Sequence, residues 1–384
     1  MPWQGVEAPR VSTKGPVLVI GTGLLGTSVA LALTSAGVEV QLSDTSPTSL
    51  ALARDMGAGQ VCDADSPEPA LVVVATPPDV AASVVLQALR EHPQAVVTDV
   101  ASVKARIAEQ VAGAGELARR YVGSHPMAGR ERSGAGAADS DLFVGRPWVV
   151  VGAGADQSAE LAVRNLAVDV GAMPVRMEAA EQDAAVAAVS HVPQLVSSLL
   201  AARLETLPES ALGLAGQGLR DTTRIAASDP RLWAAILVGN AGPVADLLCE
   251  LRADLDELIE GIAPAAETAG QGVAEGRVDL VAPGAVRAIT GVMTRGNAGH
   301  ARIPGKHGGA PRRYTEVQVL VPDRPGELGR LFSDVGDAGV NIEDFAMEHS
   351  PGQSAGLAML SVLPYSAQGL EAALHERGWR TVPS

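Results

Sequence analysis

The sequence predicts three domains: an α/β Rossmann-like domain, an all-α domain and a small βαββαβ domain. In the first half of the chain, short β-branched runs alternate with helical runs, which is typical of a doubly wound parallel sheet. After residue 178 the strand pattern gives way to Ala/Leu-rich helical stretches, and after residue 313 strands return. A length of 384 residues accommodates two or three domains of ordinary size.

Composition narrows the class of protein further. Apolar residues make up 47% and charged residues 19%, which excludes a disordered or fibrous chain. A net charge of −15 argues against a nucleic-acid or anionic-membrane binder. Cys62 and Cys249 are far apart and fit no metal-ligand spacing, so we expect a cytoplasmic protein without a metal. No apolar stretch approaches bilayer length, and residues 1–16 are expected to be a flexible leader rather than a signal peptide.

The first domain is expected over residues 17–178. Its two final strands and the helix between them are predicted to extend the sheet that the earlier elements form. The expected strands are Val17–Ile20, Val38–Leu42, Leu71–Ala75, Ala95–Thr98, Trp148–Val151 and Pro174–Met177, and the expected helices are Leu24–Ala36, Ser46–Met56, Asp79–Glu91, Ser102–Ala112 and Asp156–Val170.

The second domain is expected over residues 179–293 and reads as four helices. Several of them are apolar on more than one face, which an intertwined homodimer would bury, although a large monomeric helical domain remains an alternative. The expected helices are Ala180–Glu205, Pro230–Asn240, Gly242–Ile262 and Glu267–Ile289.

Residues 294–313 are rich in Gly and Pro and hold five cations and no acid, which predicts a basic linker or, alternatively, a phosphate-binding patch. Residues 314–384 then follow a strand, helix, strand, strand, helix, strand order. The corresponding ranges are Glu316–Val321, Leu328–Ala338, Ile342–Glu348, Leu357–Val362, Ser366–Arg377 and Trp379–Val382.

A glycine-rich turn connects the first expected strand to the first helix. Its residues are Gly21, Thr22, Gly23, Leu24, Leu25 and Gly26, the G-x-G-x-x-G spacing of a dinucleotide-binding turn. Asp44 follows the second strand, where a carboxylate accepts hydrogen bonds from ribose hydroxyls and repels a 2′-phosphate, so NAD is predicted over NADP. Asp44 is also a candidate helix N-cap. Thr76 and Pro77 follow the third strand, at the sheet edge where ligands bind.

Two segments at the same edge carry candidate chemistry. Ser102 lies in Asp99-x-x-Ser102-x-Lys104, and His125 lies in a loop after a short strand around Tyr121–Val122, with a proline after it. A histidine placed there is a candidate proton acceptor for hydride transfer from a C–OH group, and Ser102 is a candidate to hold its tautomer. A buried structural histidine is the alternative.

The helical half adds an anion-binding candidate. His191 and Gln194 lie in an otherwise apolar helix, and Arg220 and Arg224 precede Trp233. The guanidinium of arginine suits bidentate capture of a carboxylate. Surface ion pairs for the arginines and a core position for the histidine are the alternatives.

Together these segments resemble the prephenate/arogenate dehydrogenase family from Val17 to about Ile289. The motifs that carry the resemblance are Gly21–Gly26, Asp99-x-x-Ser102-x-Lys104, His125–Gly129 with Glu131, Ser133 and Gly134, Ala138-Asp139 to Leu142-Phe143, Ser190-His191-x-Pro193, and Asp221-x-Thr223-Arg224-Ile225-Ala226 with Trp233.

The resemblance implies NAD-dependent oxidative decarboxylation of a cyclohexadienol acid. His125 would accept the hydroxyl proton as hydride leaves C4 for NAD, and loss of CO2 would make the ring aromatic. Ser102 would orient His125 and contact the nicotinamide. Arg224 and His191 would hold the substrate's carboxylate end, with Arg220, Gln194 and Trp233 nearby.

The C-terminal region resembles an ACT domain, a regulatory unit that commonly binds amino acids at paired interfaces. The resemblance rests on the turn after Val317–Val321 and on Gly339–Ile342. It implies a tyrosine effector, with phenylalanine and tryptophan as alternatives, although some ACT domains only dimerise. The implied effector-binding residues are Asp323, Pro325, Gly326, Leu328, Asn341 and Ile342.

Three other functions are alternatives for this sequence. Arogenate differs from prephenate only in bearing an ammonium in place of a keto group, so the sequence does not separate the two substrates. A non-catalytic sensor of NAD and an amino acid is disfavoured by the intact set of His125, Ser102 and Arg224. Hydroxyacid-type dehydrogenases typically rely on a catalytic lysine in the helical half. No lysine lies between Lys104 and Lys306, so this class is excluded.

Overall fold

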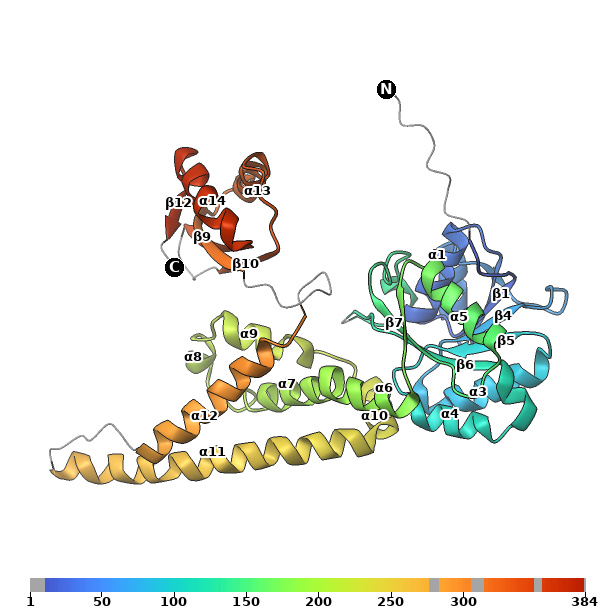
Figure 1. Cartoon of the computed structure of the whole chain (residues 1–384), viewed down its shortest axis with the longest axis horizontal. Coiled ribbons are helices and arrows are strands. Elements are labelled where there is room, and N and C mark those ends of the chain that lie inside the picture. The colour runs from blue at the N-terminus through green and yellow to red at the C-terminus, as the bar shows by residue number, and fades with distance from the viewer. Residues whose placement is uncertain (1–10, 131, 276–282, 305–313, 349–353, 383–384) are drawn as a thin grey trace. The chain divides into compact units, whose positions relative to one another are not determined.

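The computed structural model describes residues 11–130, 132–275, 283–304, 314–348 and 354–382 (Figure 1). The chain forms two compact units, residues 1–251 and 252–384. Most of the expected leader, part of the expected linker and Glu131 lie outside the described residues. The domain boundaries near residues 178, 293 and 313 stay predictions.

An eight-stranded sheet of order β3-β2-β1-β4-β5-β6-β7-β8 forms the centre of the first unit. The predicted wholly parallel sheet is wrong at one place, because β6 and β7 pair antiparallel. Parallel strands are usually joined through an α-helix, whereas the described part of the connection between β6 and β7 contains only the 3-10 turn Ala135–Ala137. The two-residue strand β3 was not expected. The strands are β1 Val17–Ile20, β2 Val40–Ser43, β3 Gln60–Val61, β4 Leu71–Val74, β5 Val96–Asp99, β6 Tyr121–Pro126, β7 Pro147–Val151 and β8 Met173–Arg176.

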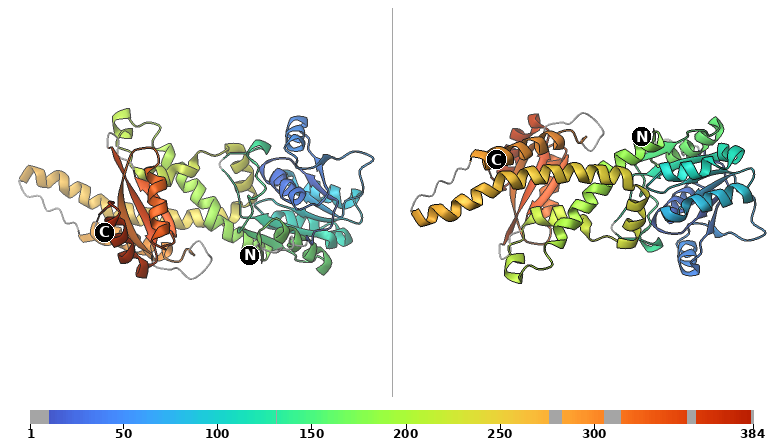
Figure 2. Two further views of the ribbon diagram at one scale, coloured as in Figure 1. Left: turned by 90° about the horizontal axis from the view of Figure 1, so that it is seen from above. Right: turned by 90° about the horizontal axis from the view of Figure 1, so that it is seen from below.

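Helices cover both faces of this sheet (Figures 1 and 2). Alternate residues of β1 show the division, since Val17 and Val19 pack with one group of helices and Leu18 packs with the other. Burial on both faces explains why the central strands are continuous apolar runs, each fully buried side chain contributing about 1.5–3 kcal/mol. The first face carries α1 Leu24–Ser35, α2 Pro47–Asp55 and α5 Gln157–Asp169, and the second carries α3 Pro78–Glu91 and α4 Ala105–Ala112. Helix α10 Pro230–Gly239 packs against α3.

The expected helix Ala180–Glu205 is interrupted in the middle. It forms α6 Ala179–Val186, a π turn at Ala187–His191, and α7 Val192–Ala202. Pro193 explains the interruption, because its ring has no N–H to donate to the preceding turn. Short elements that the sequence analysis missed follow it: α8 Glu209–Leu212, α9 Gln217–Thr223 and a 3-10 turn at Arg224–Ala226.

The expectation that no apolar stretch approaches bilayer length is wrong for the same region. By length and composition Ala179–Ala202 is apolar enough to cross a membrane, with a mean hydropathy of 1.5, and the bent pair Pro230–Gly239 and Ala241–Ala266 passes the same test together. However, Gln182, Asp183 and His191 lie within the first stretch and make hydrogen bonds inside the protein. These contacts tie the stretch to the first unit, although only 33% of its apolar window is buried.

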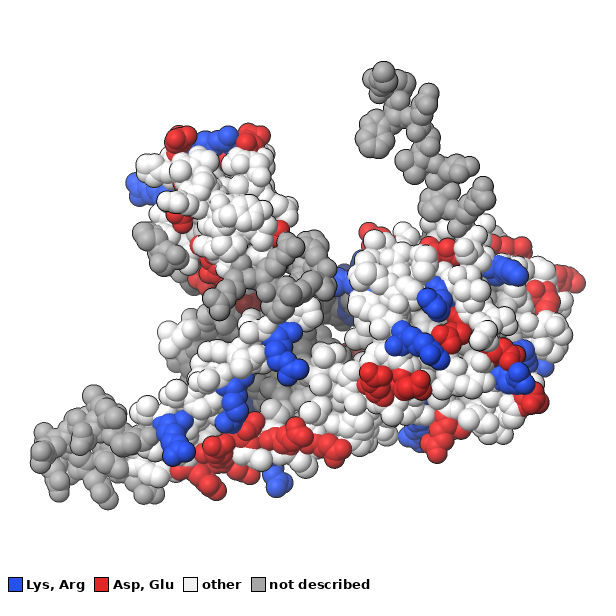
Figure 3. Space-filling model, in the orientation of Figure 1, with Lys and Arg blue, Asp and Glu red and all other residues white. Residues whose placement is uncertain are grey.

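Two long helices precede the C-terminal sheet: α11 Ala241–Glu275 and α12 Pro283–His300. The predicted break between Ile262 and Glu267 is wrong, because α11 continues through Pro264. Helix α12 also extends beyond the predicted end at Ile289, into the expected linker. Within the second unit, Arg295 of α12 pairs with Asp254 at 2.8 Å and Glu257 at 3.6 Å, and Figure 3 shows acidic side chains along this part of α11.

The C-terminal residues form the expected βαββαβ arrangement. Its antiparallel sheet has the order β10-β11-β9-β12. Val317, Val319 and Val321 alternate along β9 and bury one face under the two helices. The elements are β9 Thr315–Pro322, α13 Glu327–Asp337, β10 Asp344–Glu348, β11 Ala355–Val362, α14 Pro364–Glu376 and β12 Arg380–Val382.

Candidate active site

The glycines between β1 and α1 divide into two kinds. Gly21 has a φ of +100°, and a Cβ there would lie 2.5 Å from the carbonyl oxygen of Ala75. A Cβ on Gly26 would lie 1.9 Å from the carbonyl oxygen of Gly21. A Cβ on Gly23 would meet nothing within 4 Å. Gly21 and Gly26 therefore permit close backbone packing, whereas Gly23 leaves open space before the free N–H groups of α1.

Asp44 lies beside this turn, at the end of β2. Its Oδ2 accepts hydrogen bonds from the Thr22 amide at 2.6 Å and the Thr22 hydroxyl at 2.8 Å, and its Oδ1 accepts from the Ser46 amide at 2.7 Å. The N-cap of α2 is Ser46, whose Oγ accepts from the Ser49 amide, so Asp44 is not the cap. A carboxylate that accepts from these three donors keeps about one lone pair for a ribose hydroxyl.

The residues at this edge fit a dinucleotide. Leu24 and Leu25 begin α1, and Pro77 immediately precedes α3. The hydroxyls of Thr76 and Ser102, after β4 and β5, are buried and have no hydrogen-bond partner among the described residues. Two such hydroxyls follow β4 and β5 at the sheet edge where the glycine turn follows β1, which is the place where open α/β sheets bind ligands.

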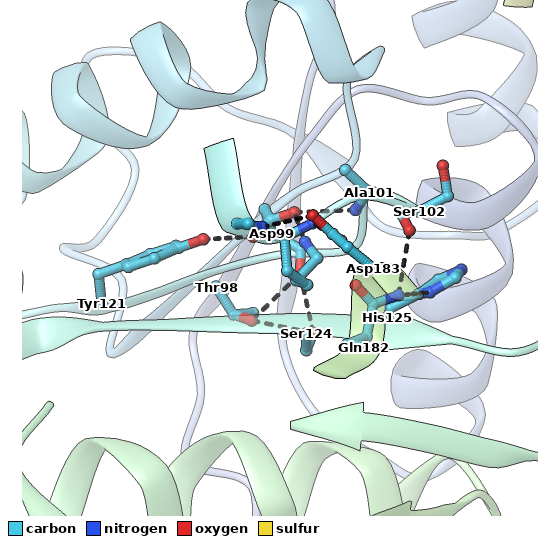
Figure 4. A network of polar contacts seen from close by, with 11 residues as sticks. Thr98, Asp99, Ala101, Ser102, Tyr121, Ser124, His125, Gln182 and Asp183 are labelled. Atoms are coloured by element: carbon cyan, nitrogen blue, oxygen red, sulfur yellow. Dashed lines mark hydrogen bonds and ion pairs between the residues drawn. The ribbon is translucent and has the colours of Figure 1, made fainter. Parts of the chain in front are cut away.

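His125 lies inside β6, whereas the sequence analysis placed it in a loop. The strand continues to Pro126 because β7 pairs with it. In this pairing His125 lies opposite Val149. The imidazole is 9% exposed. Its Nδ1 is 2.9 Å from Nε2 of Gln182 in α6 (Figure 4).

Gln182 performs the contact that was predicted for Ser102. The Ser102 hydroxyl does not contact the imidazole, and the Ser102 carbonyl instead accepts from Gln182 Nε2 at 3.1 Å. Gln182 was not predicted to be a site residue, because it follows Glu181 in the first turn of an Ala-rich helix, where polar residues are ordinary. No signal in the sequence distinguishes it.

A second missed group is a buried charge network around Lys104. The Lys104 ammonium is fully buried and paired with Asp99, which also accepts from the Tyr121 hydroxyl at 2.7 Å (Figure 4). Burial lowers the pKa of Lys104, partly opposed by the Asp99 charge, and burial raises that of Tyr121 well above its usual value. Lys104 is part of the motif that the sequence analysis quoted, but no role was assigned to it.

Asp183 joins this network to the helices. Its carboxylate accepts from the backbone amides of Lys104 at 2.7 Å and Ala105 at 2.9 Å, at the start of α4. Burial raises the pKa of Asp183, although these two N–H groups lower it in part. The sequence analysis missed this residue also.

His191 is held in the same manner as His125. It is 1% exposed, and its Nδ1 lies 3.1 Å from Nδ2 of Asn240, which also donates to the Asp183 carbonyl at 2.7 Å. The Trp233 ring meets it edge to face, with centroids 6.1 Å apart. The structure therefore brings His191 and Trp233 together, as the resemblance implied.

Both histidines are neutral near pH 7. Burial, followed by the charges of Lys104 and His191, lowers the pKa of His125 to about 3. Burial lowers the pKa of His191 to about 4. A neutral imidazole can accept a proton, which a catalytic base requires.

The remaining predicted residues lie around α9. Arg220 in α9 and Arg224 in the following 3-10 turn are exposed. Gln194 of α7 donates through Nε2 to the Ile225 carbonyl at 2.9 Å and so fixes the turn that carries Arg224. The amide nitrogen of Gln194 is thus used within the protein.

Comparison with known proteins decides the family. The chain matches "Prephenate dehydrogenase, nucleotide-binding domain" over residues 29–201 and "Prephenate dehydrogenase, dimerization domain" over residues 178–271. It is 36% identical to NovF of Streptomyces niveus, a probable prephenate dehydrogenase, over 94% of this chain and 98% of that protein. The chain belongs to the prephenate dehydrogenase family.

Other members agree with this membership. The prephenate dehydrogenase of Bacillus subtilis is 32% identical over 64% of this chain and 69% of its own length. The Aquifex aeolicus prephenate dehydrogenase, crystallised with hydroxyphenyl propionate and NAD+, has a TM-score of 0.61 and 26% identity over 73% of this chain and 97% of that one. Synechocystis arogenate dehydrogenase has a TM-score of 0.55 and 26% identity, over 67% of this chain and 98% of that one.

Gly26 and Gly23 predict opposite effects of the same substitution. Gly26→Ala should lower the free energy of unfolding by about 2–4 kcal/mol, since its Cβ would overlap a backbone carbonyl. Gly23→Ala should leave that energy within about 1 kcal/mol but weaken NAD binding by about tenfold or more, because its methyl fills the open space. Urea unfolding and NAD titration of both variants check this. Equal NAD affinity in Gly23→Ala and the wild type would contradict the assignment.

The two buried histidines predict a loss of stability in acid. The unfolded chain binds protons at histidine below about pH 6.5, whereas the folded pKa values are about 3 and about 4. Below about pH 6.5 the free energy of unfolding should therefore fall by about 1.4 kcal/mol per pH unit for each histidine. Urea unfolding between pH 7 and pH 5 should show a shallower slope in His125→Asn.

The matched control is His375→Asn, because His375 is exposed on α14. That variant should keep the wild-type slope. An identical slope in wild type, His125→Asn and His375→Asn would contradict the burial argument.

Proposed function

We propose that the chain catalyses the NAD-dependent oxidative decarboxylation of prephenate to 4-hydroxyphenylpyruvate, a step of tyrosine biosynthesis. The observation that carries this function is the match to NovF over 94% of the chain, together with a buried neutral histidine beside the nucleotide-binding edge. A non-catalytic sensor of NAD and an amino acid would have no need of such a base.

The residues at this edge meet the needs of the reaction. NAD, when bound, supplies the acceptor for the hydride that leaves C4. His125 accepts the proton of the C4 hydroxyl, and its burial keeps it unprotonated beforehand. Loss of CO2 then makes the ring aromatic, so the protein needs chiefly to align the substrate and take one proton.

Arg224 and His191 hold the carboxylate end of the substrate in this proposal, with Arg220, Gln194 and Trp233 nearby. The edge-to-face contact of Trp233 and the hydrogen bond of Gln194 to the Arg224 turn support the grouping. Arogenate, the substrate named for the Synechocystis relative, is the alternative, because it differs from prephenate in one polar group.

Replacing His125 by Asn should lower kcat by about 10²–10⁴-fold, because Asn fills part of the same space but accepts no proton at neutral pH. NADH formation from prephenate, and in parallel from arogenate, measures the effect and the substrate preference. NAD affinity, measured by titration, should stay near the wild-type value. Near-normal turnover of the variant would remove His125 from the reaction, and no NADH from either acid would remove the proposed activity.

A homodimer in the cytoplasm is also part of the proposal. The family description of residues 178–271 names a dimerization domain. Large apolar side chains of the same region are exposed, including Val189 at 67%, Leu199 at 62% and Val238 at 66%. A second copy would bury such surfaces. The two cysteines are both free, which fits a reducing compartment.

The βαββαβ domain is proposed to be an ACT domain that binds tyrosine, with phenylalanine and tryptophan as alternatives. Asp323, Pro325, Gly326 and Leu328 lie where α13 begins, and Gly326 has a left-handed φ of +90°. Asn341 and Ile342 follow the other end of α13. An 11-residue helix is about 16 Å long, so one amino acid would contact both groups only across two copies of the domain.

Tyrosine should therefore inhibit NADH formation, and Asn341→Ala should weaken the inhibition by about tenfold, the equivalent of one lost hydrogen bond. Steady-state rates at increasing tyrosine measure this, with Gln368→Ala on the exposed face of α14 as the matched control. If tyrosine, phenylalanine and tryptophan all leave the rate unchanged, the regulatory role is wrong and the domain has another purpose.

A further inference from the structure

The orientation of the Gln182 side-chain amide is fixed by its surroundings. The Ser102 carbonyl oxygen, 3.1 Å away, can only accept a hydrogen bond, so the amide nitrogen and not the amide oxygen must face it. That nitrogen has a second hydrogen, which meets Nδ1 of His125 at 2.9 Å. Gln182 is fully buried, so water does not compete for either contact.

This orientation determines which nitrogen of His125 has the proton. Because Gln182 donates to Nδ1, Nδ1 has no hydrogen, and the neutral imidazole must have its proton on Nε2. Nδ1 is occupied by the amide, so Nε2 is the nitrogen left for the substrate. In the free protein, the nitrogen available to the substrate is therefore a donor.

A side-chain amide also holds His191, in the same way as Gln182 holds His125. The contact of an amide nitrogen with Nδ1 of a buried histidine therefore occurs twice in this protein. Nδ2 of Asn240 donates to the Asp183 carbonyl at 2.7 Å and faces Nδ1 of His191 at 3.1 Å. In both amides the oxygen atom, Oε1 of Gln182 and Oδ1 of Asn240, is buried and lacks a partner among the described residues. Buried acceptors without partners are rare and costly.

We propose that Gln182 is a positioning residue that sets the tautomer of His125, and that its amide turns when substrate binds. This inference rests on the proposed function. To accept the C4 hydroxyl proton at Nε2, His125 must have its own proton on Nδ1, and that N–H needs an acceptor. The unpartnered Oε1 of Gln182 provides an acceptor after the amide turns. The hydrogen bond from Gln182 Nε2 to the Ser102 carbonyl is then lost.

The proton balance of the step is simple. The O–H bond of the substrate breaks and an Nε2–H bond forms, giving an imidazolium whose Nδ1–H donates to Gln182 Oε1. The C4–H electron pair leaves as hydride to the nicotinamide. The other charged or titratable groups acting on His125 are Lys104, paired with Asp99, and His191.

Nitrogen-15 NMR of histidine-labelled wild-type protein tests the tautomer directly, with His125→Asn used to assign the signals. In the free protein, Nε2 of His125 should be protonated and Nδ1 should not. With NAD+ and 4-hydroxyphenylpyruvate bound, Nδ1 should gain a proton. A proton on Nδ1 in the free protein would overturn the assigned tautomer, and an unprotonated Nδ1 in the ternary complex would overturn the turning of the amide.

Two variants test Gln182 by kinetics. Gln182→Met keeps the length of the side chain but gives the imidazole no partner, so kcat should fall by about 10- to 100-fold while KM stays within about threefold. Gln182→Glu offers a carboxylate that only accepts and that favours the imidazolium, so the acid limb of kcat/KM should move up by about one pH unit or more.

Gln41→Met is the matched control for these variants. Gln41 is also a buried glutamine, 4% exposed, and donates to the Pro67 carbonyl at 2.7 Å, but it has no hydrogen bond to a histidine in the described part of the chain. It should keep the wild-type kcat and pH profile. If both Gln182 variants behave as Gln41→Met does, the positioning role is wrong. The NMR measurement on the free protein needs no turnover, so it separates failure of this inference from failure of the proposed activity.

Discussion

The carboxylate of Asp183 is the interaction on which the arrangement of the site depends. It accepts hydrogen bonds from two of the N–H groups at the start of α4, a helix that has no side-chain cap of its own. Two hydrogen bonds to the positive end of a helix favour one position of that carboxylate strongly. Because Asp183 belongs to α6, this contact sets where α6 lies against the loop that follows β5.

The neighbouring contacts follow from this position of α6 against the loop after β5. Gln182 precedes Asp183 by one residue and therefore reaches the Ser102 carbonyl and His125. The carbonyl of Asp183 receives Asn240, which in turn contacts His191. One turn of helix thus positions both histidines, although they come from a strand and from a π turn more than sixty residues apart in the sequence.

The sequence could predict those parts of the site that are local. The glycine turn, Asp44 and the edge positions of Thr76 and Ser102 each follow from a strand and the few residues after it, so spacing alone reveals them. Most strands and helices were predicted for the same reason, since their apolar periodicity lies within ten or so residues.

The parts that depend on distant pairing were missed. The extension of β6 through His125 requires pairing with β7. Helix α11 continues past Pro264 despite the helix-breaking tendency of that proline. Gln182 and Asn240 act through contacts 57 and 49 residues away, and nothing in their own neighbourhoods marks them. Ser102 was expected to orient His125 because both lie at the same edge of the sheet, but its hydroxyl has no hydrogen-bond partner among the described residues, and Gln182 contacts the imidazole instead.

The buried network also explains why so weak a base suits this site. Burial disfavours a charge on His125, and the charges of Lys104 and His191 add to this, so the pKa of His125 is lowered and the imidazole stays neutral in the free protein. In the proposed binding mode, a substrate carboxylate beside His191 would favour the protonated forms of the two histidines. The base would then become stronger once the substrate is in place, which would link proton acceptance to correct binding.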